Sequence, residues 1–363
     1  MKEIGVGIIG QGFIGSVHAE AVRRVAGVKL VAVCDEDGAL AAQQAGLYGC
    51  KAYSSYADIL NDPEVDAIHN CTPNYLHYEI NRTALEKGKH VLCEKPMTMN
   101  AEEAKKLAEL ARRNPKLAAG VNFNYRMYPI IQEYKRRMAS GELGKPWLIH
   151  GRYLQDCRMY DTDYNWRVNR QTGGNALTMA DIGVHWCDLA QTLTGSRITD
   201  VMADLATVVP VRKKPNGEQV AVDLDDYGAV LVRFDNGASG VFYVSQVSAG
   251  HNNSLEIEVN TDRCSIAWKQ EENELMRIGD REIGTLTVSR SRSSPYASLP
   301  AGHPEGFDDA FKNCFSSFYG YIHGGCRNPH PDFATFEDGL STMNIMDAIL
   351  KSSSAKTWVP VEK

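Results

Sequence analysis

Apolar positions follow two different rhythms along this chain, and the rhythm changes near residue 125. Before that point, short apolar runs rich in Val and Ile alternate with stretches whose apolar positions recur at helical spacing. Continuous apolar runs of this length are typical of strands covered on both faces. We therefore predict a doubly wound parallel sheet, with strands in "IGVGIIG", "VKLVAVCD", "VDAIHNCT", "HVLCEKP" and "LAAGVNFN".

The helical pattern is clearest in the stretch "AEEAKKLAELARR". Asn100 precedes it, and Glu103 follows Asn100 by three residues, which is the spacing of a capping box. In such a box the two residues satisfy backbone N–H groups at the start of a helix. We therefore expect a helix that begins just after Asn100.

After residue 125, strand-like segments follow one another through tight turns. The "DNG" at 235–237 separates two alternating runs, and "SLEIEVNTDRCSIAWKQ" has the pattern of a second hairpin. Successive hairpins predict an antiparallel or mixed sheet, and hence an α+β domain. Helices are expected at about 175–194, 306–322 and 337–351, and a loop near residue 212. The expected domains are residues 1–124 and 125–363.

Composition narrows the classes of partner. The net charge of -6 argues against nucleic acid, which selects broad basic surfaces. The apolar runs are strand-sized, so a membrane partner is not expected. Nine cysteines without a CxxC pair suit reduced thiols in a cytoplasm, and no metal site is expected.

The first chemical motif is the glycine-rich stretch at residues 10–15, which fits GxGxxG directly after the first strand. Gly10 permits a tight turn, Gly12 lets the backbone approach a pyrophosphate, and Gly15 allows close packing of helix on strand. The helix that follows offers unpaired N–H groups to phosphates. The stretch predicts a dinucleotide site that also includes Phe13 and Ile14.

Asp35 lies twenty residues past Gly15, at the end of the second predicted strand. A carboxylate there accepts hydrogen bonds from the adenosine ribose. Glu36 and Asp37 beside it would repel a 2'-phosphate, so NAD is expected rather than NADP.

Three further polar residues stand out. Lys95 follows the apolar run "HVLC" and Glu94, and it precedes Pro96. Its ammonium group is therefore expected at the end of a buried strand. Asp181 and His185 are four residues apart in a predicted helix, which would place both on one face. Such a pair alone is more often structural, but combined with Lys95 and a dinucleotide site it indicates acid–base chemistry.

The motifs together resemble one family. "GIIGQGFIG", "CTPNYLH", "CEKP", "FNYRMYP" and "DIGVHWCDL" occur in the order found in the glucose-fructose oxidoreductase, inositol dehydrogenase and MocA family. The resemblance covers nearly the whole chain. It implies an N-terminal Rossmann domain, a C-terminal α+β domain with a large open sheet, and a homo-oligomer, tetramer or dimer, assembled through that sheet.

The resemblance also implies roles for individual residues. It makes Lys95, Asp181 and His185 the catalytic set. Around the nicotinamide half of NAD it places Thr72, Pro73, Asn74, His77, Glu94, Lys95 and Arg126.

Two later stretches, "NWRVNRQTGGN" and "LPAGHPEGFDDAF", resemble a levoglucosan- and glycoside-3-dehydrogenase-like subset of the family, which oxidises anhydrosugars or glycosides, commonly at C3. In this subset we expect the catalytic set to contact substrate together with Tyr128, Gln155, Asp156, Trp166, Arg167 and His303. For "LPAGHPEGFDDAF" the simpler interpretation is a loop that leads into a helix.

The sequence therefore predicts an NAD-dependent oxidoreductase acting on a secondary hydroxyl of a small carbohydrate or glycoside. Lys95 would donate to the reacting oxygen while His185 takes its proton, and the two residues could share the role of base. Three alternatives stay open: a cyclitol dehydrogenase, an oxidoreductase that recycles tightly bound NAD, and a non-catalytic NAD-binding sensor.

Overall fold

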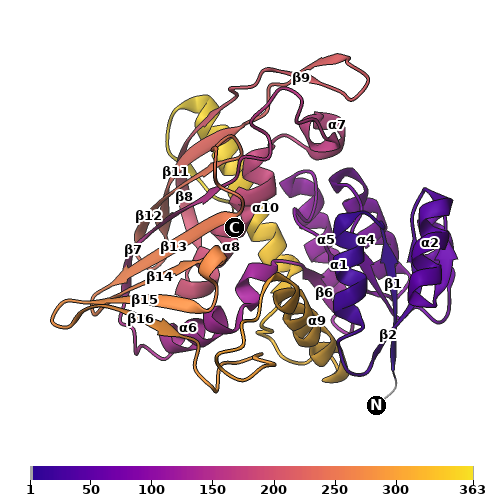
Figure 1. The fold of residues 1–363 in the computed structure, drawn as a ribbon, viewed down its shortest axis with the longest axis horizontal. Coiled ribbons are helices and arrows are strands. Elements are labelled where there is room, and N and C mark those ends of the chain that lie inside the picture. Colours follow the sequence, from indigo (N-terminus) through magenta and orange to yellow (C-terminus); the bar gives the residue numbers. More distant parts are fainter. Residues whose placement is uncertain (1–2, 363) are drawn as a thin grey trace. The chain divides into compact units, whose positions relative to one another are not determined.

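The computed structural model describes residues 3–362 and forms two compact units (Figure 1). The first comprises Met1–Met127 with Phe307–Leu340, and the second comprises Tyr128–Gly306 with Ser341–Lys363. The boundary expected at residue 124 lies near the end of the first segment. The structure adds Phe307–Leu340 to the first unit, where α9 (Phe307–His323) contacts α1 (Phe13–Val22).

The first unit is built on a seven-stranded sheet. All its strand pairs are parallel except the one with the last strand, as the strand–helix alternation predicted. The strand order is β17-β6-β5-β4-β1-β2-β3. The strands are β1 (Ile4–Ile9), β2 (Val28–Cys34), β3 (Lys51–Tyr53), β4 (Ala67–Asn70), β5 (His90–Cys93), β6 (Ala119–Val121) and β17 (Ala334–Thr335).

This order reverses at β1. The chain proceeds from β1 to β2 and β3 on one side, and then returns to place β4, β5 and β6 on the other. Ligands of open parallel sheets bind at the carboxyl ends of the strands beside such a reversal. The helices of this unit, besides α1 and α9, are α2 (Gly38–Tyr48), α3 (Tyr56–Asn61), α4 (His77–Glu86) and α5 (Ala101–Arg113), with short turns η1 (Asn74–Leu76) and η2 (Asn124–Met127).

The predicted helix start at Asn100 is confirmed. The Asn100 side chain accepts a hydrogen bond from the Glu103 N–H at 2.9 Å. The Glu103 carboxylate in turn accepts from the backbone N–H of Met99 at 3.2 Å. Reciprocal capping thus fixes where α5 begins.

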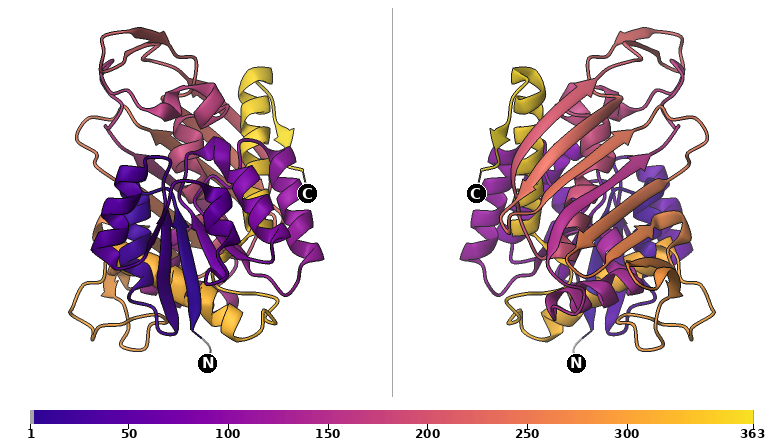
Figure 2. Two further views of the ribbon diagram at one scale, coloured as in Figure 1. Left: turned by 90° about the vertical axis from the view of Figure 1, so that its right-hand side faces the viewer. Right: turned by 90° about the vertical axis from the view of Figure 1, so that its left-hand side faces the viewer.

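The second unit contains a nine-stranded sheet in which only β7 and β12 pair in parallel. Its order is β16-β15-β14-β13-β7-β12-β11-β8-β18, and Figure 2 shows its strands side by side. Both predicted hairpins are present, as β11–β12 and β13–β14. The strands are β7 (Pro146–Leu154), β8 (Ile198–Ala206), β11 (Tyr227–Phe234), β12 (Ser239–Ser245), β13 (Ser254–Thr261), β14 (Ser265–Lys269), β15 (Leu275–Asp280), β16 (Gly284–Ser289) and β18 (Val359–Pro360).

One face of this sheet is covered by helices of the same unit. Trp186 of α8 (Val184–Thr194) stacks on Phe242 of β12 with ring centroids 4.3 Å apart. Ser352 of α10 (Phe336–Ala355) accepts a hydrogen bond from the backbone of Ala203 in β8 at 2.9 Å. The other helices and helical turns of the unit are α6 (Pro129–Ala139), η3 (Trp166–Val168), α7 (Arg170–Gly173) and η5 (Gln270–Glu272).

The helix expected at 175–194 differs from the prediction. Residues Met179–Gly183 form a π-helical turn, η4, and the α-helix α8 begins only at Val184. The buried Asp225 carboxylate accepts from the backbone N–H groups of Leu177 and Met179, both at 2.7 Å, and so caps the start of the segment. Because i→i+5 bonding widens the turn, Asp181 and His185 do not have the regular α-helical spacing that the sequence suggested.

The loop expected near residue 212 is also more ordered than predicted. It forms a two-stranded hairpin of β9 (Val211–Lys213) and β10 (Gln219–Ala221). Arg212 in this hairpin is fully buried, which a charged stretch with Pro and Gly did not indicate.

No helix among residues 3–362 is long and apolar enough to cross a bilayer.

Candidate active site

The glycine-rich loop in the first unit has the geometry that its spacing predicts. Gly10 has a φ of +91°, and a Cβ there would lie 2.6 Å from the carbonyl oxygen of Cys71, so only glycine fits. A Cβ on Gly15 would lie 2.0 Å from the Gly10 carbonyl oxygen, which is the close approach of helix to turn. A Cβ on Gly12 would meet nothing within 4 Å. Space is therefore open where a pyrophosphate would approach this backbone.

The start of α1 and the residue after β2 complete the predicted dinucleotide site. No side chain of the described residues caps α1, whose first residues are the exposed Phe13 and the half-buried Ile14. Its terminal N–H groups remain available to phosphate oxygens. The Asp35 carboxylate accepts from the backbone N–H of Gln11 at 2.7 Å and from that of Asp37 at 3.0 Å, so it is fixed beside the loop. These features fit NAD.

The residues after β4 are tied to the loop after β5. His77 is fully buried, and its Nδ1 lies 2.8 Å from the Pro96 carbonyl oxygen while its Nε2 lies 2.9 Å from that of Thr72. The Thr72 hydroxyl donates to Asn70 at 2.7 Å. Pro73 precedes η1, in which Asn74 is buried. His77 thereby holds the segment at residues 72–74 close to the backbone of Pro96.

Glu94 and Lys95 follow β5 directly. Glu94 is buried, and its Oε1 lies 2.9 Å from His18 Nε2 and accepts from Asn122 Nδ2 at 2.6 Å. Its Oε2 accepts from the backbone N–H of Lys95 at 3.3 Å, and the Lys95–Pro96 bond is cis. Burial alone would raise the pKa of Glu94, but its hydrogen bond and electrostatic interaction with His18, then the hydrogen bond from Asn122 and the charge of Lys95, lower it to about 2.

Arg126 belongs to the same unit and is buried. Its Nη1 lies 3.7 Å from a carboxylate oxygen of Asp338. The first unit therefore contains all the residues predicted to bind NAD, and the structure describes each of them.

Asp181 lies in the second unit within a dense polar network. Its Oδ2 accepts from Arg158 Nη2 at 2.8 Å and from Gln246 Nε2 at 2.9 Å. Its Oδ1 lies 3.6 Å from Arg167 Nε. The Arg158 side chain is 3% exposed, so this ion pair is largely shielded from water. Asp181 is thus fixed by residues remote in sequence.

Arg158 and Gln246 were not predicted. They stand 23 and 65 residues from Asp181, and neither belongs to a recognisable motif. Arg158 lies in the loop four residues after the end of β7, where no local signal marks it. Their contribution depends on the fold of the second unit, because three separate segments supply the network.

His185 is buried near the start of α8. Its ring centroid lies 6.3 Å from that of Tyr153 in β7. The Tyr153 hydroxyl donates to Asn253 at 2.5 Å. Aromatic packing from the sheet thus borders the imidazole.

The expected substrate contacts in the second unit are at different depths. Trp166 and Arg167 form a half-buried platform, with the guanidinium 4.3 Å from the centroid of the indole ring. Gln155 accepts from Gln246 at 2.8 Å, which joins it to the Asp181 network. Asp156 accepts from the backbone of Gly250 at 3.1 Å. Trp166, Arg167 and Gln155 are therefore linked to Asp181 within this unit.

Tyr128 and His303 differ from that group. Tyr128 is buried against Trp268, and its hydroxyl accepts from Gln270 at 3.2 Å, so packing accounts for it. His303 is exposed in the loop before α9, with its Nδ1 3.3 Å from the Pro300 carbonyl oxygen. Glu305 is buried beneath this loop and accepts from the backbone of Ser298 at 2.6 Å. The substrate roles of Tyr128 and His303 stay predictions.

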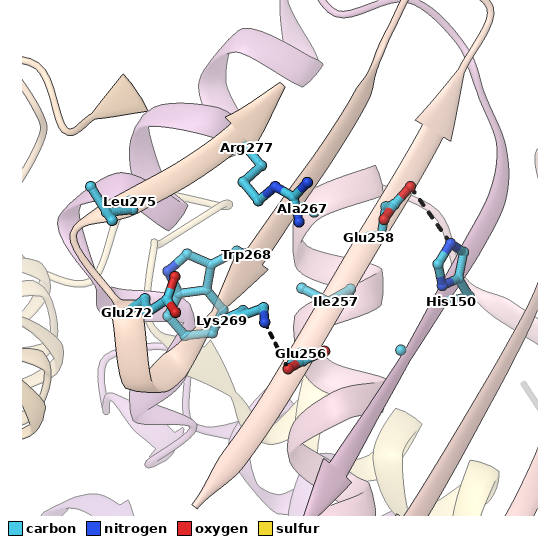
Figure 3. Close-up of a pocket in the computed structure, with 11 residues that line it drawn as sticks. His150, Glu256, Ile257, Glu258, Ala267, Trp268, Lys269, Glu272, Leu275 and Arg277 are labelled. Carbon is cyan, nitrogen blue, oxygen red and sulfur yellow. Dashed lines mark ion pairs between the residues drawn. The ribbon is translucent and has the colours of Figure 1, made fainter. Parts of the chain in front are cut away.

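A shallow pocket lies elsewhere, over strands β7, β13, β14 and β15 of the large sheet (Figure 3). Two pairs of basic and acidic side chains line it: His150 lies 3.7 Å from Glu258, and Lys269 lies 3.3 Å from Glu256. None of the predicted site residues lines it. No cluster of three or more His, Cys, Asp or Glu side chains suited to a metal occurs within residues 3–362.

Comparison with known proteins agrees with these features. Residues 4–123 match the oxidoreductase family with an NAD-binding Rossmann fold, and residues 131–267 match the GFO/IDH/MocA C-terminal domain. Levoglucosan dehydrogenase of Pseudarthrobacter phenanthrenivorans is 29% identical, with 99% of each chain covered. The scyllo-inositol 2-dehydrogenase (NAD(+)) of Bacillus subtilis is 27% identical, over 98% of this chain and 95% of its own.

A solved structure is similar throughout. The complex of levoglucosan dehydrogenase with NADH and L-sorbose has a TM-score of 0.93 at 29% identity, and the match covers 100% of both chains. The two family matches, over residues 4–123 and 131–267, together span most of the Rossmann unit and much of the large mixed sheet. This chain accordingly belongs to the GFO/IDH/MocA family of oxidoreductases, and its cofactor is NAD.

Proposed function

We propose that the protein is an NAD-dependent dehydrogenase that transfers hydride between a secondary hydroxyl of a carbohydrate and the nicotinamide ring. The carbohydrate is a sugar, an anhydrosugar or a glycoside, and the hydroxyl is the one on C3. One observation carries this proposal: Lys95 and Asp35 stand at the same edge of the parallel sheet but on opposite sides of β1.

The strand order explains why the positions of Asp35 and Lys95 matter for binding of the cofactor. Asp35 follows β2, next to β1, whereas Lys95 follows β5, two strands from β1 in the other direction, or about 10 Å away. A dinucleotide whose ribose meets Asp35 and whose pyrophosphate meets the glycine loop extends toward β4 and β5. Its reactive half would then lie on the side of Lys95.

The chemistry requires two transfers. A secondary alcohol loses a hydride and a proton and becomes a ketone, and bound NAD supplies the hydride acceptor. Lys95 donates a hydrogen bond to the reacting oxygen and stabilises negative charge as it develops. His185 accepts the hydroxyl proton, and Asp181 orients the imidazole. In this proposal Lys95, Asp181 and His185 act on the same substrate.

The Asp181 network supports a positioning role for that carboxylate. Arg158 and Gln246 both contact its Oδ2, so its orientation is fixed without help from a ligand. The platform of Trp166 and Arg167 is suited to stacking against a sugar ring and to donating to hydroxyls. Two relatives named for levoglucosan and scyllo-inositol support a polyhydroxylated ring as substrate.

A substrate screen tests the proposal. Purified protein is mixed with NAD and a panel of sugars, anhydrosugars, glycosides and cyclitols, and formation of NADH is followed by its absorbance. We expect turnover with pyranose rings that carry a free C3 hydroxyl, and a 3-keto product by NMR. Faster turnover of cyclitols would identify a cyclitol dehydrogenase instead. NAD retained through purification, seen by mass spectrometry, would indicate recycling, and no NADH with any compound would favour a sensor.

We further propose that the protein is a homo-oligomer, a dimer or tetramer, formed through the large sheet. Alternate residues of β11 and β12 are exposed on the face away from α8, and they include Leu231, Val241 and Tyr243. A large apolar face of this kind marks an interaction surface. The pocket of Figure 3 offers both signs of charge, so a twofold-related copy could pair with it.

Negative charges introduced on the exposed face of β11 and β12 should dissociate the oligomer. Leu231 and Val241 lie opposite each other on β11 and β12, and replacing both with Glu would bury two carboxylates in the contact. We expect light scattering after gel filtration to give a dimer or tetramer mass for the wild type, and the 40.1 kDa monomer mass for the double variant. Leu47→Glu on the exposed face of α2 is the matched control and should stay oligomeric. A monomeric wild type would exclude the proposal.

A further inference from the structure

The first unit contains a continuous chain of buried polar side chains that the sequence motifs did not indicate. Its members are His18 on α1, His69 on β4, Glu94 after β5 and Tyr319 on α9. Tyr319 O–H lies 2.7 Å from His69 Nε2, His69 Nδ1 lies 2.9 Å from His18 Nδ1, and His18 Nε2 lies 2.9 Å from Glu94 Oε1. The two histidines are 0% exposed and Tyr319 is 1% exposed.

The surroundings of the chain are apolar. Phe315 of α9 packs against both imidazoles, with centroid distances of 4.8 Å to His18 and 4.6 Å to His69. Phe311 adds an edge contact to His18 at 5.4 Å. Because such surroundings have a low dielectric, each hydrogen bond in the chain is strengthened and any unpaired member is costly.

Donor and acceptor rules give the chain a direction. An ionised carboxylate only accepts, so His18 must donate to Glu94 through Nε2–H. A fully buried cation between Phe311 and Phe315 would be costly, so the chain is built with a neutral His18. Its Nδ1 then accepts from His69 Nδ1–H. Burial holds the pKa of His69 well below its usual value, so His69 is neutral too, and its Nε2 accepts from Tyr319.

The chain ends at the residue that contacts Lys95. The Glu94 carboxylate accepts the backbone N–H of Lys95, and Asn122 donates to the same oxygen that His18 contacts. We propose that Tyr319, His69 and His18 are positioning residues, which set the tautomer of His18 so that its Nε2–H holds the Glu94 carboxylate in place beside Lys95. This inference rests on the proposed function, because it assigns Lys95 to the reacting oxygen.

The chain itself is tested by NMR of protein with 15N-labelled histidine, without substrate. We expect His69 to carry its proton on Nδ1 and His18 on Nε2. Tyr319→Phe removes the donor to His69 Nε2, so the Nδ1–H form of His69 should lose population. Tyr321→Phe removes a hydroxyl from the same helix and should leave both tautomers unchanged. A wild-type His69 protonated on Nε2, or a doubly protonated His18, would overturn the direction of the chain.

The positioning role is tested by two matched replacements of His18. The amide of His18→Gln can replace the Nε2–H donor to Glu94, whereas that of His18→Asn matches the Nδ1 position and leaves Glu94 without this donor. We expect kcat to fall about 10- to 100-fold in His18→Asn, as for the loss of a hydrogen bond to a charged group, and to stay within about threefold in His18→Gln. The Kd for NADH, from its fluorescence, should change little in either variant, because the glycine loop is intact.

The outcomes separate the two proposals. Equal kcat values in the Gln and Asn variants, with only the melting temperature lowered, would show a structural role and overturn the inference. A wild type that oxidises no alcohol would contradict the proposed function. In that event the tautomers of His18 and His69 still decide whether the directional chain exists.

Discussion

Replacing Lys95 with Met is expected to reduce kcat roughly 10²- to 10⁴-fold while NAD still binds. Met keeps the length and the apolar stem of the side chain but removes the ammonium group. The reacting oxygen would then lose its hydrogen-bond donor and the positive charge that stabilises it. Steady-state turnover on the substrate found in the screen measures the loss, and NADH fluorescence measures binding.

Lys105→Met is the matched control for this experiment. Lys105 lies exposed on α5, so its replacement should leave both turnover and NADH binding unchanged. Near-normal turnover of the Lys95→Met enzyme would refute the assignment of this lysine to the chemistry. Loss of NADH binding in the same variant would instead indicate a role in holding the cofactor.

Replacing Arg212 with Met is expected to lower the free energy of unfolding by about 3–5 kcal/mol, the usual cost of breaking one side of a buried ion pair. Arg212 and Asp226 are both 0% exposed, and their side chains meet at 2.6 Å. Arg212 also donates to the carbonyl oxygens of Arg158 and Tyr160, at 3.0 and 3.1 Å. Its removal would leave a buried carboxylate without its cation and several carbonyls without a donor.

Urea titration of the Arg212→Met protein, followed by circular dichroism, measures this loss. Lys214→Met is the control from the same hairpin, because its pair with Glu218 is exposed and should contribute little. Since Arg212 holds the carbonyl of Arg158, and Arg158 holds Asp181, turnover should fall as well. Unchanged unfolding in the Arg212→Met protein would show that the pair does not stabilise this unit.

Local patterns were sufficient to predict the parallel sheet, both hairpins of the second unit and the start of α5. Each of these signals lies within a few residues: apolar runs mark buried strands, "DNG" marks a hairpin turn, and Asn100 with Glu103 marks a helix start. The glycine loop belongs with them, because a φ of +91° at Gly10 restricts that position to one residue type.

Other features could not be predicted because they depend on contacts between remote segments. The π-helical turn around Asp181 departs from the regular spacing that a helical pattern implies. The hairpin at 211–221 depends on burial of Arg212 against Asp226, although its sequence is charged and turn-rich. The addition of Phe307–Leu340 to the first unit depends on α9 packing against α1.

The sequence by itself determined the family and the cofactor, because these depend on short motifs whose geometry is local. Only the tertiary structure determined which remote side chains contact the residues of these motifs. Arg158 and Gln246 reach Asp181 across 23 and 65 residues, and Tyr319 reaches His69 across 250. A hydrogen bond forms only where folding brings two side chains within about 3 Å, and no periodicity along a chain encodes that distance.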